Sequence, residues 1–233
     1  MAEGKLVAFE GIDGSGLTTQ AHKLASWFRG QGQRCRLTKE PSEGPVGALI
    51  RLVVQKRLRE LAEENDLDHW LALLFAADRQ DHLTNVILPT IRNGIHVITD
   101  RYYLSSFAYQ GLKVDFGHLG AMNGRCRRPD LTVFLDVPVD VCKDRIDQER
   151  SQNRWGTDLY EEPDKLAEVR RKFFEAMDHL KAHGDRIEIV NGNDAPDRVH
   201  ESVLAAVQKM LAENDAPKSR LLLPDAAGIA TAL

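Results

Sequence analysis

The sequence predicts an α/β fold, in which helices cover both faces of a parallel sheet. Two observations indicate this class. Apolar runs alternate with helical patterns along the chain, and several of these runs are apolar throughout. Strands that are apolar throughout are typical of a parallel sheet buried on both faces. We expect strands at residues 5–10, 34–38, 96–99, 131–137 and 187–190, and helices at residues 17–30, 46–55, 68–93, 104–110, 139–149, 163–183 and 195–213.

The first strand leads into a glycine-rich segment, GIDGSGLTT, at residues 11–19. It fits the phosphate-binding pattern G-x-x-x-x-G-K-[ST] except that Leu17 stands where lysine is expected. The segment follows a strand and opens a helix that carries Leu24, Trp27 and Phe28 at helical spacing, which is the context this motif requires. Backbone N–H groups and the positive end of the helix bind phosphate without the lysine. The loop therefore predicts phosphate binding, and catalysis is a separate question because a cation at the outer phosphates is missing.

The second strand ends in the turn Thr38-Lys39-Glu40-Pro41, and Arg51 lies on the next helix. Pro41 makes the turn rigid. Glu40 could accept a hydrogen bond from a sugar hydroxyl or orient an arginine. In isolation this signal is weak, because turns at strand ends often have such a composition.

The third helix carries Phe75 and Arg79 four residues apart, so both side chains share one face. An aromatic ring with a guanidinium one turn later could stack on a nucleobase and donate to its edge. The alternative is that Phe75 belongs to the core while Asp78 and Arg79 form the solvated end of the helix.

Asp100 and Arg101 directly follow the third apolar strand. Ligands of a doubly wound sheet bind at the carboxyl ends of its strands. Asp100 could hold Mg²⁺ directly or through water, and Arg101 could bind a phosphate with two N–H groups. The alternative is an ion pair that closes the strand end, but the glycine-rich loop favours the functional interpretation.

The helix after this turn begins with Ser105 and Ser106, and it ends with Tyr109 and Gln110. The serines can cap the helix. The polar ends of Tyr109 and Gln110 suit contact with a nucleoside, although a capped helix needs no ligand.

Basic residues gather on and after the helix expected at residues 139–149: Lys143, Arg145, Arg150 and Arg154. Arginines beside a polar loop could close over the transferred phosphate and replace the missing lysine, whereas charged helix faces are often no more than solvated. The polar segment at about residues 150–162 predicts a lid-type loop. Residues 215–233 predict a loosely attached tail.

The composition of the 233-residue chain, with 42% hydrophobic and 28% charged residues, is typical of one globular domain. A net charge of −4 argues against a general nucleic-acid or membrane-surface binder. Cys35, Cys126 and Cys142 make neither a disulfide framework nor a zinc pattern, so we expect a cytoplasmic protein. Since residues 1–5 contain no long apolar stretch and lead directly into a strand, we expect no signal peptide, and we expect no segment that spans a bilayer.

Taken in order, these segments resemble the thymidylate kinases, which are P-loop nucleoside monophosphate kinases. The resemblance lies in FEGIDGSGLTTQ, TKEP, LLFAADR, DRYYLSSFAYQG and RPDLTVFLDVP, which span residues 9–138. It implies a P-loop NTPase-type three-layer fold, with a parallel five-stranded sheet flanked by helices and a short lid. This forms one kinase domain over residues 1–214, commonly as a homodimer. The implied activity is transfer of the γ-phosphoryl group of ATP to dTMP, giving dTDP and ADP, with Mg²⁺.

The resemblance also implies residue roles on the acceptor side. Asp13 would lie near the sugar 3′-hydroxyl and the reaction centre. Phe75 would stack on the thymine and Arg79 would bind its edge. Arg51 and Arg101 would hold the acceptor phosphate, and the Tyr109 ring would disfavour a ribose 2′-hydroxyl. The expected dTMP site comprises Asp13, Glu40, Pro41, Arg51, Phe75, Arg79, Arg101, Ser105, Ser106, Tyr109 and Gln110.

On the donor side, the resemblance implies that Thr18 binds Mg²⁺ with Asp100 close by. The ATP phosphates would lie against Gly11, Asp13, Gly14, Ser15, Gly16, Leu17, Thr18 and Thr19. With Leu17 uncharged, Arg150 and Arg154 are the expected replacements for the lysine, because the family often supplies lid arginines there. The expected catalytic residues are then Asp13, Arg101, Arg150 and Arg154.

Two departures from the family pattern leave alternatives open. Leu17 replaces the lysine, and the lid reads TDLYEEP instead of an arginine-phenylalanine-glutamate pattern. A catalytically silent nucleotide-binding homologue would have the same pocket. A kinase of another deoxynucleoside monophosphate, such as dUMP, would share most of it. The acceptor residues are all in place, which favours an active enzyme.

Overall fold

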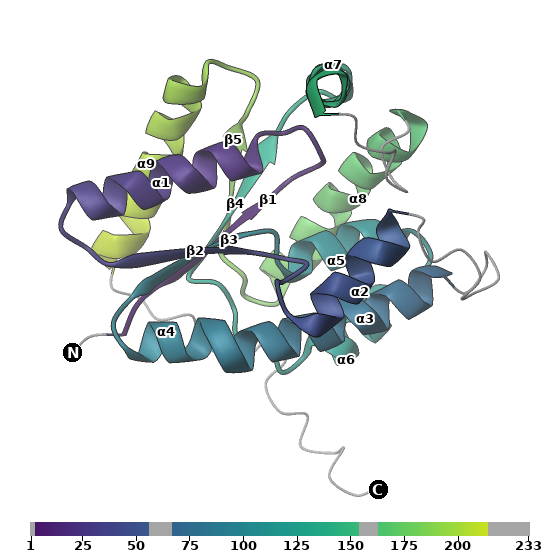
Figure 1. Ribbon diagram of the computed structural model, residues 1–233, viewed down its shortest axis with the longest axis horizontal. Coiled ribbons are helices and arrows are strands. Elements are labelled where there is room, and N and C mark those ends of the chain that lie inside the picture. Colours follow the sequence, from purple (N-terminus) through teal and green to yellow (C-terminus); the bar gives the residue numbers. More distant parts are fainter. Residues whose placement is uncertain (1–2, 56–66, 154–162, 214–233) are drawn as a thin grey trace, which may run out of the picture.

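The computed structural model describes residues 3–55, 67–153 and 163–213. Five strands form one sheet in the order β2-β3-β1-β4-β5, and all four neighbouring pairs are parallel (Figure 1). The strands are β1 (Leu6–Glu10), β2 (Cys35–Lys39), β3 (His96–Asp100), β4 (Leu131–Asp136) and β5 (Ile187–Asn191). The predicted α/β fold with a parallel five-stranded sheet is confirmed, and each strand end lies within one residue of its expected place.

The central strand β1 shows how the sequence forms two core layers. Successive strand side chains point to opposite faces. Leu6 and Ala8 pack in one hydrophobic cluster and Val7 and Phe9 pack in the other, all of them fully buried. A strand with both faces covered must be apolar throughout, which is why the run 6–9 contains no polar residue.

Within the described residues, one group of helices covers one face of the sheet and a second group covers the other (Figure 1). The first group consists of α1 (Leu17–Gly30) and α9 (Pro196–Glu213). The second group consists of α3 (Leu67–His82), α4 (Leu88–Arg92), α5 (Tyr103–Tyr109), α6 (Phe116–Asn123) and α8 (Pro163–Ala182). Helix α2 (Pro45–Val54) packs on α3, and α7 (Val139–Asn153) follows β4 and packs on α8.

The structure corrects two expected helices and adds one that was not expected. The helix expected at residues 68–93 consists of α3, a π-helical turn at Leu83–Ile87 and α4. Pro89 lies in the first turn of α4 and has no N–H to donate, which accounts for the altered turn before it. A 3₁₀ turn, Gln110–Leu112, extends α5. Helix α6 was not expected, because Gly117 and Gly120 lower its helix propensity, while Asp115 caps it at 2.9 Å from the His118 N–H.

Helix α7 is also longer than expected. It continues to Asn153, so residues 150–153 of the predicted lid are helical. The remainder of the predicted lid, residues 154–162, lies outside the described residues, as do residues 214–233 of the predicted tail.

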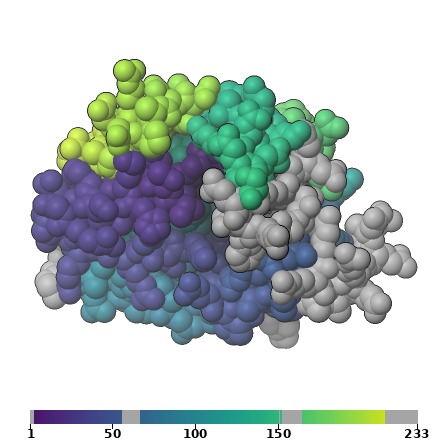
Figure 2. All heavy atoms as spheres, turned by 45° about the horizontal axis from the view of Figure 1, so that its top comes forward, coloured from purple at the N-terminus to yellow at the C-terminus, as the bar shows by residue number. Residues whose placement is uncertain are grey.

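The strand order places a crevice at the carboxyl ends of β1 and β4. The connection that follows β1 runs toward β2, at one edge of the sheet. The connection that follows β4 runs toward β5, at the opposite edge. Ligands of such sheets bind where neighbouring connections run in opposite directions. Figure 2 shows the N-terminal segment (purple), α7 (teal) and α9 (yellow-green) on this side of the molecule.

Candidate active site

The glycine-rich loop joins β1 to α1, and two of its glycines adopt conformations that other residues rarely adopt. Gly14 has φ 78° and Gly16, which precedes α1, has φ 93°. A Cβ atom at Gly14 would lie 2.5 Å from the carbonyl oxygen of Cys142 in α7, so glycine is also needed there for packing. The loop therefore takes its shape from its glycines, and the lysine of the motif plays no part in it.

A cavity of about 480 Å³ lies over this loop. Seven of the eight residues expected at the ATP phosphates line it: Asp13, Gly14, Ser15, Gly16, Leu17, Thr18 and Thr19. Gly11 lies behind them, and its carbonyl oxygen accepts a hydrogen bond of 2.8 Å from Arg101 Nη1. The other walls come from β3, α7 and the segment 192–199 after β5. The cavity thus has room for an anionic ligand against the backbone of the loop and the start of α1.

Leu17 is 6% exposed and packs in the hydrophobic layer between the sheet and helices α1 and α9. Its Cδ2 atom would lie 3.4 Å from a Cβ atom at Gly11. The side chain therefore fills space behind the loop. Ser15 is also buried, and its hydroxyl has no hydrogen-bond partner among the described residues.

Thr18 and Asp100 meet at the floor of the cavity. The Thr18 hydroxyl donates to Asp100 Oδ2 at 2.5 Å. Hydroxyl and carboxylate oxygens are ligands that Mg²⁺ accepts. Within the described part of the chain, no group of three or more His, Cys, Asp or Glu side chains is arranged to hold a metal ion. A cation bound at this pair would thus need oxygen atoms from phosphates or water for its remaining ligands.

Arg101 follows β3 in a left-handed conformation, with φ 70°, and its guanidinium points back toward the glycine-rich loop. It donates to Ser105 Oγ at 3.0 Å and to Asp13 Oδ1 at 2.5 Å. Tyr109 donates to the other carboxylate oxygen of Asp13 at 3.0 Å. Burial disfavours the charge of Arg101, but nearby Tyr109 and Asp13 outweigh this effect and raise its pKa. The site therefore contains a permanently charged guanidinium held in one orientation.

Glu10 supports this arrangement from below, and sequence reasoning missed it because a glutamate at the end of an apolar run gives no distinct signal. The side chain is fully buried. It accepts hydrogen bonds from the Tyr102 N–H at 2.9 Å, the Ser105 N–H at 3.2 Å and the Ser105 hydroxyl at 2.5 Å. Burial raises the pKa of the Glu10 carboxyl to about 7. The hydrogen bonds from Ser105 and the charges of Arg101 and Arg79 lower this pKa, but their effect is smaller than that of burial. Glu10 thus fixes the first turn of α5, next to Arg101.

The raised pKa of Glu10 predicts that stability falls as pH rises. The unfolded chain ionises this group near pH 4.5, and the folded chain ionises it near pH 7. Its contribution is therefore fully present below the lower pKa and is lost as pH rises through the higher one. We expect Glu10 to lower the free energy of unfolding by about 3 kcal/mol over this interval. Glu10→Gln should flatten the slope, measured by urea unfolding at intervals from about pH 5 to about pH 8.

Glu201→Gln is the matched control, because Glu201 is exposed on α9. It should leave the slope unchanged. Equal slopes for Glu10→Gln and the unmodified protein would contradict the raised pKa.

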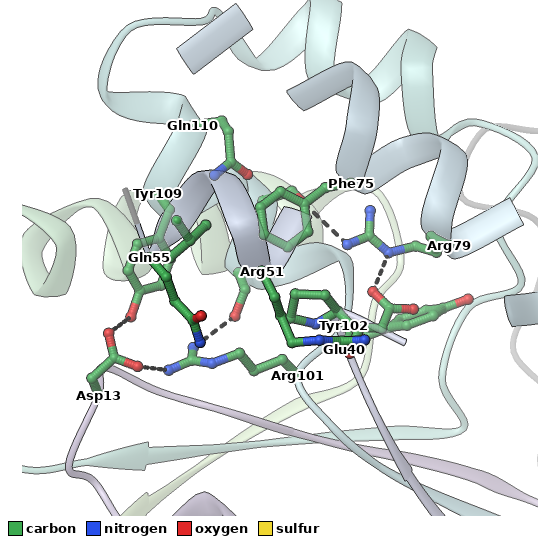
Figure 3. Close-up of a pocket in the computed structure, with 14 residues that line it drawn as sticks. Asp13, Glu40, Arg51, Gln55, Phe75, Arg79, Arg101, Tyr102, Tyr109 and Gln110 are labelled. Atoms are coloured by element: carbon green, nitrogen blue, oxygen red, sulfur yellow. Dashed lines mark hydrogen bonds and ion pairs between the residues drawn. The ribbon is translucent and has the colours of Figure 1, made fainter. Parts of the chain in front are cut away.

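A second cavity, of about 180 Å³, lies between α2, α3, α5 and the end of β3 (Figure 3). All eleven residues expected at the dTMP site line it. Three further lining residues, which sequence reasoning missed, are Val54, Gln55 and Tyr102. The first two continue the helix that carries Arg51, so its spacing could have indicated them. The Phe75 ring faces the cavity and is half-buried, so it is not a core residue (Figure 3).

Arg79 is almost completely buried at the back of this cavity, with 1% exposure. Its Nε donates to Glu40 Oε2 at 2.8 Å. Its two terminal nitrogens donate to Asn123 Oδ1 at 2.5 Å and to Ser106 Oγ at 3.1 Å. The alternative that Asp78 and Arg79 form a solvated helix end is therefore wrong.

The turn after β2 is fixed by similar contacts. Asp78 is fully buried and accepts hydrogen bonds from the Ser42 N–H at 2.7 Å and the Ser42 hydroxyl at 2.6 Å. Arg51 Nη1 donates to the carbonyl oxygens of Pro41 at 3.1 Å and Ser42 at 2.6 Å. These contacts connect the turn that carries Glu40 to α2 and α3, which both line the second cavity.

The side chains of the two arginines expected to replace the lysine lie outside the described residues. Arg150 lies in the last part of α7, and its side chain is outside the described residues. Arg154 is also outside them.

Within residues 3–55, 67–153 and 163–213, no helix is both long enough and apolar enough to cross a membrane.

Comparison with known proteins identifies the family. The thymidylate kinase family model matches residues 9–203. A probable thymidylate kinase of Pyrococcus abyssi (strain GE5 / Orsay) is 41% identical over 214 residues, covering 89% of this chain and 98% of that protein. A probable thymidylate kinase of Thermococcus kodakarensis (strain ATCC BAA-918 / JCM 12380 / KOD1) is 35% identical over 210 residues, covering 89% and 98%. A thymidylate kinase of Nitrosomonas eutropha (strain DSM 101675 / C91 / Nm57) is 34% identical over 220 residues, covering 90% and 94%. These matches confirm the resemblance of the motifs, and the chain belongs to the thymidylate kinase family.

Proposed function

We propose that this protein transfers the γ-phosphoryl group of ATP to dTMP, giving dTDP and ADP. The observation that carries the proposal is that Asp13 and Arg101 line both cavities. Phosphoryl transfer requires the donor phosphate and the acceptor oxygen to lie in line and close together. A ligand in the loop cavity and one in the second cavity would present their phosphates to the same guanidinium. Arg101 then stabilises the charge that moves between them.

The acceptor nucleotide occupies the second cavity in this proposal. Phe75 stacks on the thymine and Arg79 binds its edge, while Arg51 and Arg101 hold the phosphate. Asp13 lies near the sugar 3′-hydroxyl. The remaining acceptor contacts come from Glu40, Pro41, Ser105, Ser106, Tyr109 and Gln110, with the Tyr109 ring against the sugar.

The donor nucleotide lies against the loop backbone, and Thr18 and Asp100 hold Mg²⁺ there. Bound Mg²⁺ supplies positive charge that offsets the charge of the phosphates. Arg150 and Arg154 complete the donor side as catalytic lid residues. We further propose one kinase domain over residues 1–214, a homodimer and a cytoplasmic location. The free thiols of all three cysteines fit a reducing compartment.

The proposal is tested by ADP release from ATP and Mg²⁺ with dTMP, dUMP, dCMP and dGMP as acceptors. We expect dTMP to be the best acceptor. The Arg150→Ala/Arg154→Ala protein, purified in parallel, excludes a contaminating kinase if its turnover is lost. Equal rates for all four acceptors would contradict the thymine site. Binding of both nucleotides without turnover would favour the silent homologue.

Phe75→Ala should weaken dTMP binding without affecting ATP. Stacking of a base on an aromatic ring contributes about 1–3 kcal/mol, so we expect KM for dTMP to rise about 10- to 100-fold. KM for ATP should change less than about twofold because Phe75 lines the other cavity. Leu73→Ala is the control, since Leu73 is on the same helix and 47% exposed. An unchanged KM for dTMP in Phe75→Ala would place the base elsewhere.

A further inference from the structure

Glu40 uses its two carboxylate oxygens on two different partners. Its Oε2 accepts a hydrogen bond from Arg79 Nε at 2.8 Å, and its Oε1 lies 3.3 Å from Nδ1 of His82. All three side chains are buried. The last torsion of a glutamate has broad minima, so a carboxylate with one partner can still turn about it. Partners at both oxygens therefore fix the plane of the Glu40 carboxylate.

His82 is itself oriented by a hydrogen bond on each ring nitrogen. It is the last residue of α3, and its Nε2 lies 2.7 Å from the hydroxyl oxygen of Thr38 in β2. A carboxylate only accepts hydrogen bonds, so a neutral imidazole here carries its hydrogen on Nδ1, and Nε2 accepts from the Thr38 hydroxyl. A chain of hydrogen bonds thus runs from β2 through His82 and Glu40 to Arg79.

His82 and Thr38 are separated from the proposed nucleotide site. They line a third cavity, of about 500 Å³, which lies between β2, α1 and the end of α3. Among the described residues, none lines both this cavity and the second one. Glu40 and Arg79 do line the second cavity. His82 therefore reaches a nucleotide there through Glu40.

The contact with His82 determines how Glu40 pairs with Arg79. Arg79 donates to Glu40 through Nε, and its terminal nitrogens donate to Asn123 and Ser106. A guanidinium has more N–H groups than these three contacts use, so the others are available to a nucleobase. A carboxylate with both oxygens free often takes two parallel N–H groups of an arginine. Because His82 occupies the second oxygen of Glu40, those N–H groups stay available to the ligand.

We propose that His82 is a positioning residue for the nucleobase, and that it acts by holding Glu40 in a single contact with Arg79. The inference rests on the proposed kinase function and extends it to the choice of base. Thymine presents a carbonyl oxygen where cytosine presents an amino group, so an available arginine N–H favours thymine. Loss of the contact between His82 and Glu40 should weaken dTMP binding and reduce the preference for dTMP over dCMP.

The test uses the full chain and two amide substitutions that divide the functions of the ring. His82→Asn keeps an N–H donor near the position of Nδ1, facing Glu40. His82→Gln places its amide near the position of Nε2, facing Thr38. In the ADP-release assay, His82→Gln should raise KM for dTMP about tenfold, with KM for ATP within about twofold. It should also lower the ratio of kcat/KM for dTMP to that for dCMP about tenfold, and His82→Asn should stay within about threefold of the unmodified protein in each quantity.

His22→Gln is the control, because His22 is exposed on α1 and lines the same third cavity. It should match the unmodified protein, and urea unfolding checks that each variant is folded. Equal changes in His82→Asn and His82→Gln would show that the ring acts by packing alone and would overturn the proposal. A folded His82→Gln protein with an unchanged preference for dTMP over dCMP would overturn it as well.

Calorimetric binding of dTMP and dCMP gives a readout that does not require turnover. His82→Gln should weaken dTMP binding about tenfold and change dCMP binding less than about threefold. An equal loss for both nucleotides would show that the base edge is not affected and would overturn the proposal. If the unmodified protein binds dTMP but phosphorylates no acceptor, the kinase function fails, and the two affinities still decide the role of His82.

Discussion

Arg101→Ala is expected to lower kcat for dTMP phosphorylation by about 10³- to 10⁵-fold. The side chain joins Asp13, Gly11 and Ser105 at the boundary of both cavities, so its charge lies where the transferred group passes. An arginine that stabilises a phosphoryl-transfer transition state contributes about this much, which corresponds to about 4–7 kcal/mol. Steady-state ADP release with both substrates saturating measures the effect.

Arg101→Lys separates charge from geometry. Lysine keeps the positive charge but cannot make the fixed set of N–H contacts that Arg101 makes, so we expect a smaller loss of about 10- to 100-fold. Thermal unfolding of both variants checks that the site has not collapsed. Arg101→Ala with a kcat within tenfold of the unmodified protein, in a folded enzyme, would move the reaction centre away from Arg101.

Arg79→Met is expected to cause the largest loss of stability. Its partner Glu40 is 4% exposed, so the substitution leaves a buried carboxylate with His82 as its remaining partner, at 3.3 Å. Removing one member of a buried ion pair costs about 3–5 kcal/mol, mainly because the other charge stays buried. Asn123 and Ser106 lose hydrogen-bond partners as well. The free energy of unfolding in urea, at pH 7, measures the loss.

The Arg79→Met/Glu40→Gln double variant tests this explanation. It removes the isolated charge, so it should be more stable than Arg79→Met alone by about 1–2 kcal/mol. Arg92→Met is the control for losing an arginine, because Arg92 is exposed at the end of α4. A double variant no more stable than Arg79→Met would mean that lost packing, and not the buried carboxylate, determines the loss.

The sequence predicted those features that depend on short segments. The strands follow from the apolar runs and the glycine-rich loop from its motif, whereas the eleven residues of the second cavity follow from the resemblance of several short motifs to those of the thymidylate kinases. Features that depend on distant residues could not be predicted in this way. Glu10, at the end of β1, accepts hydrogen bonds from the start of α5. Asn123 accepts a hydrogen bond from Arg79 and lies on α6, which was not predicted because its two glycines weaken the helical signal in the sequence.

Arg145 illustrates the same limit. Its sequence context, a charged helix, also fits a solvated surface. Its relation to the loop arises because β1 and β4 are neighbours in the sheet, which no segment near residue 145 encodes. Arg145 and Gly14 are hydrogen-bonded to each other although they lie 131 residues apart in the sequence.

The burial of Leu17 makes a lysine difficult to accommodate at this position. A lysine in its place would have to put an ammonium group where Leu17 now contacts an apolar layer, at a considerable desolvation cost, or extend into the cavity and leave that space unfilled. Either outcome lowers stability even if it improves phosphate binding. A positive charge on a neighbouring element would improve phosphate binding without this loss of stability, so a motif search that requires the lysine would miss a chain built in this way.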